Sequence, residues 1–522
     1  MKYAILIAAI IFIASAVVSL QRHIHMYQQN SYFLKRYFNW GKSHIGFKLW
    51  FNVILALVCL VLFFLKAYIV ALVIAAIQFV CKLLAFKVYN KTAIKKLVYT
   101  NRVKRLITCA CIILALSLLL LASSFNNATL SILSFSLVLL LSCVPACLLV
   151  VSAFIMGFIE KAISNSYVKE AKDILKSMPN LKVIGVTGSY GKTSAKFILK
   201  RILSEKYNVT ATPESFNTPM GIVRTVREHL TPQTEIFIAE MGAKNIGDIK
   251  ELCELAKPTT GIITAVGPQH LESFKTVENV AKTKFELADF THNVYVNFES
   301  EAAKQKASEY VTHPYGLQKG CETYAKNILV SYKGTEFDLV HFDTEIHLTT
   351  KLLGNHNVLN IVGACAIALE LGVSPESIKY AVSTLTPTEH RLEKKAFLNG
   401  SILLDDSYNS NPEGSKMAVE VLGQFEDKTK IIVTPGMVEL GEKEYEFNYK
   451  LGEYAAKVCD YLIFVGDTRS IPLKKAALDN GFNEENIFIC KRFKDSLEIL
   501  QRLCNNDTVV LFENDLPDNY AG

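Results

Sequence analysis

The strongest constraint on the fold of this 522-residue chain is a set of long apolar stretches confined to its first third. Each stretch is near the ~20 residues that an α-helix needs to cross a bilayer. The sequence therefore predicts a multi-span α-helical membrane region over residues 1–160, inserted in the lipid bilayer. The apolar stretches are residues 3–20, 49–65, 67–86, 106–123 and 129–157.

The first stretch has two interpretations, a signal peptide or a membrane anchor. We favour the anchor, because no small-x-small cleavage site follows and further apolar stretches do. Charged side chains within the stretches would indicate a transport pathway. Only Lys66 and Lys82 lie there, and both are close enough to helix ends to extend to the membrane surface. An anchor is therefore favoured over a channel.

Basic residues predict the orientation of this region. Lys and Arg cluster after the first stretch and again after the third, whereas the connection at Lys66 is short and residues 125–129 carry no basic residue. With five spans, this alternation places the amino terminus outside and the chain after residue 160 in the cytoplasm, where ATP is present. The sequence thus predicts a multi-pass membrane protein with cytoplasmic soluble domains.

Composition after the membrane region is that of an ordinary soluble α/β protein. The net charge of +7 is modest and lies largely in the membrane-proximal loops, without interleaved aromatic residues. Nucleic acid is therefore not predicted as a partner. The twelve cysteines form no C-x-x-C pair, and six lie within apolar runs. We interpret Cys109 and Cys111 as small apolar residues of membrane helices and not as metal ligands.

The segment VTGSYGKTS, residues 186–194, lies between a short β-branched run and a helical pattern. A glycine-containing loop in this position presents backbone N–H groups and a helix N-terminus to an anion. Lys192 would reach the β- and γ-phosphates of ATP, and Thr193 would offer its hydroxyl to Mg²⁺. A strict eight-residue pattern would have glycine where Val186 stands, and such turns also occur for packing reasons. The predicted nucleotide contacts are Thr187, Gly188, Ser189, Gly191, Lys192, Thr193 and Ser194.

The spacing T-G-S-x-G-K-T-S resembles the ATP loop of the Mur ligase family, whose members build the peptide of bacterial cell-wall precursors. Seven further segments resemble the family's motifs and follow in the family's order. Two of them, D-D-S-Y-N and M-x-E-L-G, favour the MurF branch, which joins D-Ala-D-Ala to UDP-MurNAc-tripeptide. The segments are FIAEMGAKNIGDI (237–249), ITAVGPQHLESF (263–274), VAKTKFEL (280–287), LLGNHNVLNIVGACAIALELG (352–372), TPTEHRLE (386–393), LLDDSYNSNPEG (403–414) and TPGMVELGEKEYEFN (434–448).

This resemblance implies a P-loop Mur ligase central ATP-binding domain with a parallel-rich sheet over residues 175–387. It also implies a C-terminal Rossmann-like domain over residues 388–522. Alternating strand and helix patterns agree with both. The stretch 301–350 is less regular and is interpreted as an insertion or a small subdomain. The chain departs from the family in its N-terminal region, because predicted membrane helices occupy the place of the domain that binds the UDP-sugar.

The resemblance also assigns chemical roles. Thr193 and Glu240 match ligands of a first Mg²⁺, and His270 matches a ligand of a second ion. Lys284 matches a lysine that CO₂ can carbamylate, which converts a cation into a carboxylate-like ligand, with Glu286 as a supporting acid. The predicted catalytic residues are Lys192, Glu240, His270 and Lys284.

Further positions match groups that contact the nucleotide. Asn357 and Asn360 match residues at the adenine, although asparagines at a helix start also serve as caps. Arg391 and Asp406 match C-terminal groups that reach back to ATP, Asp406 toward the ribose. Asn448 stands where many MurF-type chains have histidine.

The implied activity is ATP-dependent amide ligation through an acyl phosphate, with ATP and Mg²⁺ as cofactors. The amine is D-Ala-D-Ala or another donor, and the acceptor is UDP-MurNAc-tripeptide or a different, lipid-linked envelope precursor. The implied location is the bacterial cytoplasmic membrane. A nucleotide-binding scaffold without turnover is the remaining alternative. A scaffold of this kind would be expected to have other residues in place of Lys192, Glu240, His270 or Lys284, but all four are present.

Overall fold

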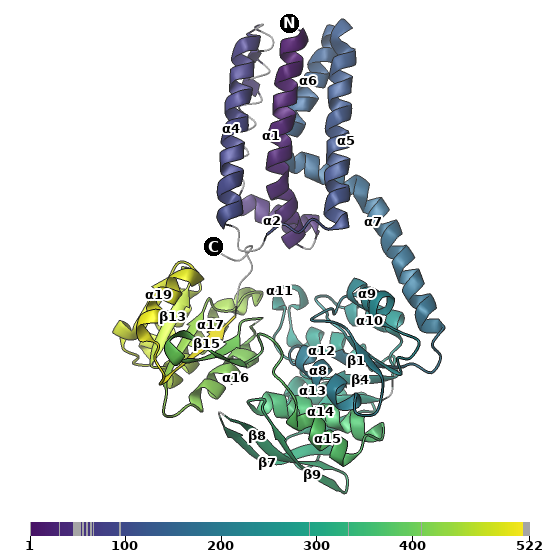
Figure 1. Ribbon diagram of the computed structural model, residues 1–522, viewed down its shortest axis with the longest axis vertical. Coiled ribbons are helices and arrows are strands. Elements are labelled where there is room, and N and C mark those ends of the chain that lie inside the picture. Colours follow the sequence, from purple (N-terminus) through teal and green to yellow (C-terminus); the bar gives the residue numbers. More distant parts are fainter. Residues whose placement is uncertain are drawn as a thin grey trace. The chain divides into compact units, whose positions relative to one another are not determined.

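A computed structural model describes residues 2–514, except 31, 45–53, 55–56, 59–60, 63–64, 66, 93–95, 292, 332 and 409. The described residues form two compact units, residues 2–165 and 166–514 (Figure 1). Most of the predicted span 49–65 lies outside the described residues.

The first unit is helical. Its central helix α1 packs against α4, α5 and α6 (Figure 1). Four described helical segments are long and apolar enough to cross a membrane, namely Tyr3–Gln29, Leu72–Lys91, Asn101–Asn126 and Pro145–Lys176. The helices are α1 (Lys2–Gln29), α2 (Leu34–His44), α4 (Tyr68–Thr92), α5 (Asn101–Ser123), η1 (Ser124–Asn126), α6 (Ala128–Cys143) and α7 (Pro145–Lys176).

The predicted apolar stretch 129–157 is divided between two helices. Helix α6 ends at Cys143 and α7 begins at Pro145, with Val144 between them at φ −117° and ψ 72°. Proline has no backbone N–H and disfavours helical backbone at the preceding residue. Pro145 therefore starts a new helix and interrupts the apolar run, leaving α6 shorter than a typical span.

The second unit is built first on a nine-stranded sheet. Its strands are parallel as far as β7, and β7, β8 and β9 form an antiparallel meander at one edge. The stretch 301–350 thus extends the main sheet. In spatial order the strands are β2 (Val209–Ala211), β3 (Ile236–Glu240), β1 (Lys182–Thr187), β4 (Thr260–Ile263), β5 (Val294–Asn297), β6 (His313–Gly316), β7 (Thr323–Ser331), β8 (Gly334–His341) and β9 (Thr344–Thr350).

Helices cover both faces of this sheet, which is why its central strands are almost continuously apolar. Ile184 and Val186 of β1 face a core shared with α8, α14 and α15, whereas Val183 faces a core shared with α9, α10, α12, α13 and the end of α7. The helices are α8 (Lys192–Leu203), α9 (Pro219–His229), α10 (Asp248–Ala256), α11 (Leu271–Phe274), α12 (Val277–Phe285), α13 (Glu301–Ala307), α14 (Asn355–Glu370) and α15 (Pro375–Ser383).

A six-stranded sheet follows, parallel except for its edge strand β10. The strand order is β10 (Glu393–Ala396), β11 (Ile402–Asp406), β15 (Thr508–Glu513), β12 (Thr429–Thr434), β13 (Tyr461–Val465) and β14 (Ile487–Cys490). Its helices are α16 (Pro412–Gly423), α17 (Glu444–Val458), α18 (Ser470–Asp479) and α19 (Phe493–Leu503), with short turns η2 (Leu398–Gly400), η3 (Gly441–Lys443) and η4 (Glu484–Asn486). The predicted fold class, membrane-type helices followed by two α/β sheets, is confirmed.

Candidate active site

The loop between β1 and α8 has a backbone that requires glycine at two positions. Gly188 has φ 151° and Gly191 has φ 80°, both in the region that L-residues rarely adopt. A Cβ at Gly188 would lie 2.1 Å from Thr264 Oγ1, and one at Gly191 would lie 2.8 Å from Asn360 Oδ1. The glycines therefore let neighbouring strands and helices close around the loop.

Two of the predicted nucleotide contacts hold this loop in place through their side chains. The Thr187 hydroxyl donates to Met241 O at 2.9 Å, and Gly267 N donates to Ser189 Oγ at 3.1 Å. Ser189 N also donates to Ala265 O at 2.7 Å. These bonds tie the loop to the ends of the two strands beside β1. A direct role of Thr187 and Ser189 in binding ATP stays a prediction.

Lys192 begins α8 and folds back over the loop. Its Nζ donates to Gly188 O at 2.7 Å and to Ser189 O at 3.0 Å. Burial lowers the pKa of Lys192 to about 8, the Glu240 carboxylate opposes this shift, and the Arg391 cation adds to it. Lys192 also lowers the pKa of His270 and of Lys284. Four predicted site residues from separate motifs therefore lie within electrostatic range of one lysine.

Glu240 closes β3 and is surrounded by donors. Thr193 Oγ1 and Asn217 Nδ2 each donate to Glu240 Oε1 at 3.1 Å. Lys196 Nζ lies 3.0 Å from Glu240 Oε2, and the exposed fractions of the two side chains are 0% and 1%. Lys196 also donates to the carbonyl of Glu214. Glu240 is therefore a fixed, ion-paired carboxylate.

Sequence reasoning missed two partners of Glu240. Lys196 follows Lys192 by four residues on α8, so it projects from the same helix face, and this spacing was an available signal. Asn217 lies in the loop before α9, and nothing in its sequence context distinguishes it from a turn residue.

The residues around Glu240 fit a magnesium ion that is completed by phosphate oxygens. Mg²⁺ takes oxygen ligands, and proteins commonly supply one or two of them while substrate phosphates and water supply the rest. Thr193 Oγ1 and Glu240 provide such a pair. Within the described part of the chain, no group of three or more His, Cys, Asp or Glu side chains could hold a metal ion by itself.

His270 stands at the start of α11 in left-handed backbone conformation, with φ 50°. Its Nδ1 lies 2.5 Å from Glu439 Oε2, and Lys244 Nζ lies 3.5 Å from Glu439 Oε1. Burial lowers the pKa of His270, and the hydrogen bond with Glu439 opposes the shift. Glu439 belongs to the M-x-E-L-G segment, so two motifs far apart in sequence meet here. A metal-binding role for His270 stays a prediction.

Lys284 lies on α12 and is 1% exposed. Burial, and then the nearby Lys192 cation, lower the pKa of Lys284 well below its ordinary value. Lys284 differs from Lys196 in that no described residue forms a hydrogen bond or ion pair with its amine. Glu286, expected to support it, opposes the lowering of the Lys284 pKa. Glu286 also accepts from Gly247 N at 2.8 Å and Lys250 N at 2.9 Å and thereby caps α10. Its role as supporting acid stays a prediction.

A cleft of about 530 Å³ lies beside α8. Arg391 lines it and stacks over the Tyr408 ring, with the guanidinium carbon 4.4 Å from the ring centroid. Asn357 also lines it, while its Nδ2 donates to Leu353 O at 2.9 Å. The Asn360 side chain lies beside Gly191, close enough that a Cβ there would meet it. Adenine contacts by Asn357 and Asn360 stay predictions. The remaining lining residues are Thr193, Ser194, Phe197, Ile198, Arg201, Glu214, Ser215, Leu352, Thr384, Leu385, Thr386, Pro387, Thr388, Glu389, His390 and Tyr408.

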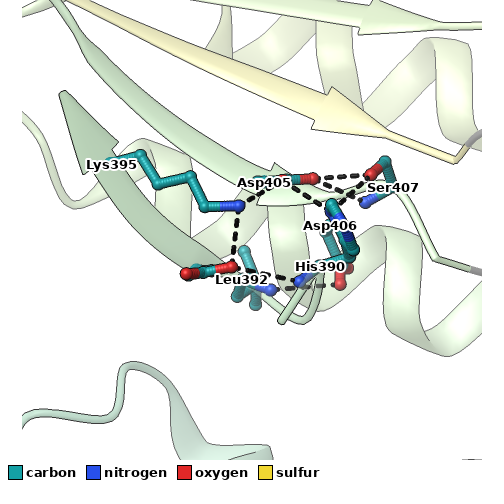
Figure 2. A network of polar contacts seen from close by, with 7 residues as sticks. His390, Leu392, Lys395, Asp405, Asp406 and Ser407 are labelled. Atoms are coloured by element: carbon teal, nitrogen blue, oxygen red, sulfur yellow. Dashed lines mark hydrogen bonds and ion pairs between the residues drawn. The ribbon is translucent and has the colours of Figure 1, made fainter. Parts of the chain in front are cut away.

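Asp406 ends β11 next to a network centred on Asp405 (Figure 2). Asp405 Oδ2 lies 2.8 Å from both Lys395 Nζ and His390 Nδ1, and its Oδ1 accepts from Ser407 Oγ at 2.6 Å. Leu392 N donates to Asp406 Oδ1 at 3.2 Å. Burial raises the pKa of Asp406 to about 6 against the influence of Arg391. A contact between Asp406 and the ribose stays a prediction.

Two asparagines of the last motifs have structural roles. The Asn448 side chain accepts from Met437 N at 2.8 Å and donates to Met437 O at 3.1 Å, so it holds the M-x-E-L-G loop. Asn411 caps α16 by accepting from Gly414 N at 2.9 Å. Asn409, the last residue of the D-D-S-Y-N segment, lies outside the described residues.

Two family models match the second unit. Residues 186–368 match the Mur ligase middle domain, and residues 390–512 match the Mur ligase glutamate ligase domain. The chain is 28% identical over 335 residues to the UDP-N-acetylmuramoyl-tripeptide–D-alanyl-D-alanine ligase of Bacillus subtilis, covering 64% of this chain and 72% of the relative. It is 29% identical to the ligase of that name from Escherichia coli, covering 55% and 64%.

A solved structure of a ligase is also similar to this chain. The MurF ligase of Thermotoga maritima in complex with ADP matches with a TM-score of 0.59 and 26% identity, covering 69% of this chain and 81% of that one. Across eight such curated ligases, this chain spans between 59 and 73% of the relative's length.

Proposed function

Because the chain belongs to the Mur ligase family, its two family models together matching more than half of it, we propose a specific ligase activity. The protein is an ATP-dependent ligase, anchored in the bacterial cytoplasmic membrane, that joins D-Ala-D-Ala to UDP-MurNAc-tripeptide. The names of the matching relatives and the ADP complex of the T. maritima ligase support the reaction. The long apolar helices of the first unit support the anchor.

The observation that carries this proposal is the convergence on Lys192. Glu240, His270, Lys284 and Arg391 come from four separate motifs, and each exchanges electrostatic influence with that lysine. The pKa values of Lys192, His270 and Lys284 are all lowered, and such a cluster of perturbed groups is typical of a catalytic site. Next to this cluster, the loop Gly188–Gly191 leads into the N-terminus of α8 at Lys192. A loop and helix N-terminus of this kind bind anions such as phosphate.

The reaction has two steps. A carboxylate oxygen of the tripeptide attacks the γ-phosphorus of ATP, giving an acyl phosphate and ADP. The neutral amine of D-Ala-D-Ala then attacks the acyl carbon, phosphate leaves, and an amide forms. Both reactants of the first step are anionic, so positioned cations lower its barrier. Lys192 and Arg391 supply them.

Thr193 and Glu240 would hold the magnesium ion, which supplies charge neutralisation at the phosphates. Lys196 and Asn217 keep the Glu240 carboxylate oriented toward Thr193. Lys284 would contribute after reaction with CO₂, in which the amine gains a carboxylate and releases a proton. That reaction requires a neutral amine, and burial favours this form of Lys284.

Product formation by the full-length chain tests the proposal. The detergent-purified protein would receive ATP, Mg²⁺, bicarbonate, D-Ala-D-Ala and UDP-MurNAc-tripeptide, with the product identified by mass. We expect UDP-MurNAc-pentapeptide. Absence of product, with ATP binding intact, would contradict this acceptor and favour a lipid-linked or other envelope precursor.

Matched variants test the site itself. Lys192→Ala and Glu240→Ala should each lower turnover by roughly 10²–10³-fold, since each removes a charge that acts on the transferring phosphoryl group. Lys200→Ala, an exposed lysine of the same helix α8, should leave turnover unchanged. Wild-type turnover in either site variant would remove that residue from the catalytic machinery.

A further inference from the structure

The first unit carries a charge imbalance that an inert anchor does not require. Residues 1–165 contain 16 lysines and arginines but one acidic residue, Glu160. Glu160 is already engaged, with Oε1 2.7 Å from Arg105 Nε and Oε2 4.0 Å from Arg102 Nε. Residues 1–165 therefore offer no second carboxylate to the other basic residues of this segment. An anion that neutralises those residues comes from outside the segment.

One of these basic residues, Lys96, lines a pocket of about 320 Å³. The pocket lies between the last turns of α1 and α4 and the segment that follows α4. Its lining combines aromatic rings, amides, a histidine and a lysine, with no acidic residue. The lining residues are Gln21, His25, Phe86, Tyr89, Asn90, Lys96, Leu97 and Tyr99.

The wall of the pocket is held in place by side-chain contacts. His25 Nδ1 lies 2.6 Å from the Tyr89 hydroxyl, and Gln29 Nε2 lies 3.0 Å from His25 Nε2. The Arg22 guanidinium carbon lies 5.3 Å from the centroid of the Tyr89 ring. These contacts position a cation directly beside a wall of the pocket.

Two cations, Lys96 in the lining of this pocket and Arg22 beside it, have no carboxylate partner among the described residues. Arg22 Nε is buried without a hydrogen-bond acceptor, and Lys96 forms no ion pair with any described residue. Burying a charged donor without an acceptor costs free energy, so such a group favours an anionic ligand. Oxygen-rich anions, phosphates above all, satisfy arginine and lysine together.

The position of the pocket along the helices indicates where the anion comes from. Roughly 27 Å of helix separate Tyr3 from Gln21 at 1.5 Å per residue, close to the ~30 Å hydrocarbon thickness of a bilayer. Gln21 and Lys96 therefore lie near the level of the lipid head groups, at the basic end of the unit. Tyr89 and Tyr99 fit the aromatic belt found at that level.

We propose that this pocket binds the phosphate of an anionic membrane lipid, with Lys96 and Arg22 as its cationic partners. Basic pockets between membrane helices commonly take lipid head groups of this kind. The site would fix a lipid against the anchor independently of ligation. The proposal does not depend on the ligase reaction, and its test uses no ATP or amine.

Native mass spectrometry of the detergent-solubilised full-length chain tests the site. Titration with dioleoylphosphatidylglycerol should give saturable binding of one lipid, and dioleoylphosphatidylcholine should bind more weakly. Lys96→Gln and Arg22→Gln should each weaken phosphatidylglycerol binding about fivefold, the equivalent of ~1 kcal/mol per cation. Lys96→Arg should retain binding. Lys104→Gln, an exposed lysine of α5 in the same unit, should not change it.

Three results would overturn the proposal. An equal loss in Lys104→Gln would show diffuse attraction to the basic surface. Equal affinity for phosphatidylcholine would show that the anionic head group is not what is recognised. Displacement of the lipid by millimolar inorganic phosphate would assign the pocket to a soluble anion. An unchanged melting temperature of Lys96→Gln in detergent would confirm that weaker binding is not caused by unfolding.

Discussion

Two buried lysines of the middle domain, Lys196 on α8 and Lys284 on α12, have the same side chain in opposite electrostatic settings. Both are almost completely shielded from solvent, with 0% of the Lys196 side chain and 1% of Lys284 exposed. Lys196 lies 3.0 Å from the Glu240 carboxylate. Lys284 has no described ion-pair partner, and its largest electrostatic neighbour is another cation, Lys192.

This difference shows how burial and a carboxylate partner together set the pKa of a lysine amine. Burial lowers the pKa of Lys196 too, but the Glu240 carboxylate opposes that shift and favours the charged amine. Removal of either member of such a buried pair leaves an isolated buried charge. Without such a partner, burial lowers the pKa of Lys284 well below its ordinary value and so favours the neutral amine. Lys196 is therefore suited to positioning Glu240, and Lys284 to reacting as a nucleophile.

The largest effect is expected at Lys196. Lys196→Met should lower the free energy of unfolding by about 3–5 kcal/mol, because Glu240 remains buried without its cation. The measurement is the urea dependence of alkylation at Cys365, a buried residue of the same core, followed by peptide mass in the full-length protein. Lys200→Met, at an exposed position of α8, should change it by less than about 0.5 kcal/mol. Equal effects in the two variants would refute the ion-pair interpretation.

Lys284→Met should affect turnover and not stability, in contrast to the loss of stability expected for Lys196→Met. Turnover should fall by roughly 10²–10³-fold, as for loss of one stabilising group at a reacting phosphate. Stability by the same alkylation assay should be unchanged or higher, because no carboxylate is left unpaired. Wild-type turnover should also depend on added bicarbonate. Lys282→Met, an exposed lysine two residues away, should behave as wild type in both assays. A destabilisation as large as that of Lys196→Met would mean that Lys284 is charged and paired.

Lys192 should make stability depend on pH. Its folded-state pKa of about 8 lies below the ordinary 10.5, so above pH 8 the unfolded chain retains a proton that the folded chain has released. Stability of the ligand-free protein should therefore rise from pH 8 to 9.5. Lys192→Met should show a smaller rise over the same interval, measured by denaturation at each pH. Parallel curves for the two proteins would contradict the lowered pKa.

The smallest effect is expected at Glu286. Glu286→Ala should cost about 1 kcal/mol of stability, typical of a lost helix cap, with turnover changed only a few-fold. The alkylation and mass assays described above measure both quantities. A bicarbonate-dependent loss of turnover comparable to that of Lys284→Met would instead support the predicted role of Glu286 as the acid that assists Lys284.

Some features could be predicted because their causes are local. The loop at 186–194 and the helix that follows require only a β-branched run, glycines at 188 and 191, and a helical pattern. Glu240 was identified from its motif, and its place at a strand end follows from an apolar run that stops there. The separation between apolar helices and an α/β part follows from segment length and hydropathy alone.

Other features depend on contacts that sequence separation hides. The pairing of His270 with Glu439 joins residues 169 positions apart. Asn217 donates to Glu240 from a loop whose sequence has no distinguishing pattern. Glu286 caps α10 by accepting from Gly247 N, 39 residues earlier in the chain. The division of the stretch 129–157 had a local signal in Pro145, although the apolar run around that proline hides it.

The sequence by itself determined the chemistry available to this protein. It specified an ATP loop, the ordered motifs of a ligase, an apolar anchor and the basic end of that anchor, because each depends on residue type and spacing along the chain. Only the tertiary structure decided which buried lysine has a carboxylate partner and which has none among the described residues, and which cations border a pocket. Burial and partner distance set those properties, and both arise when segments far apart in sequence pack together.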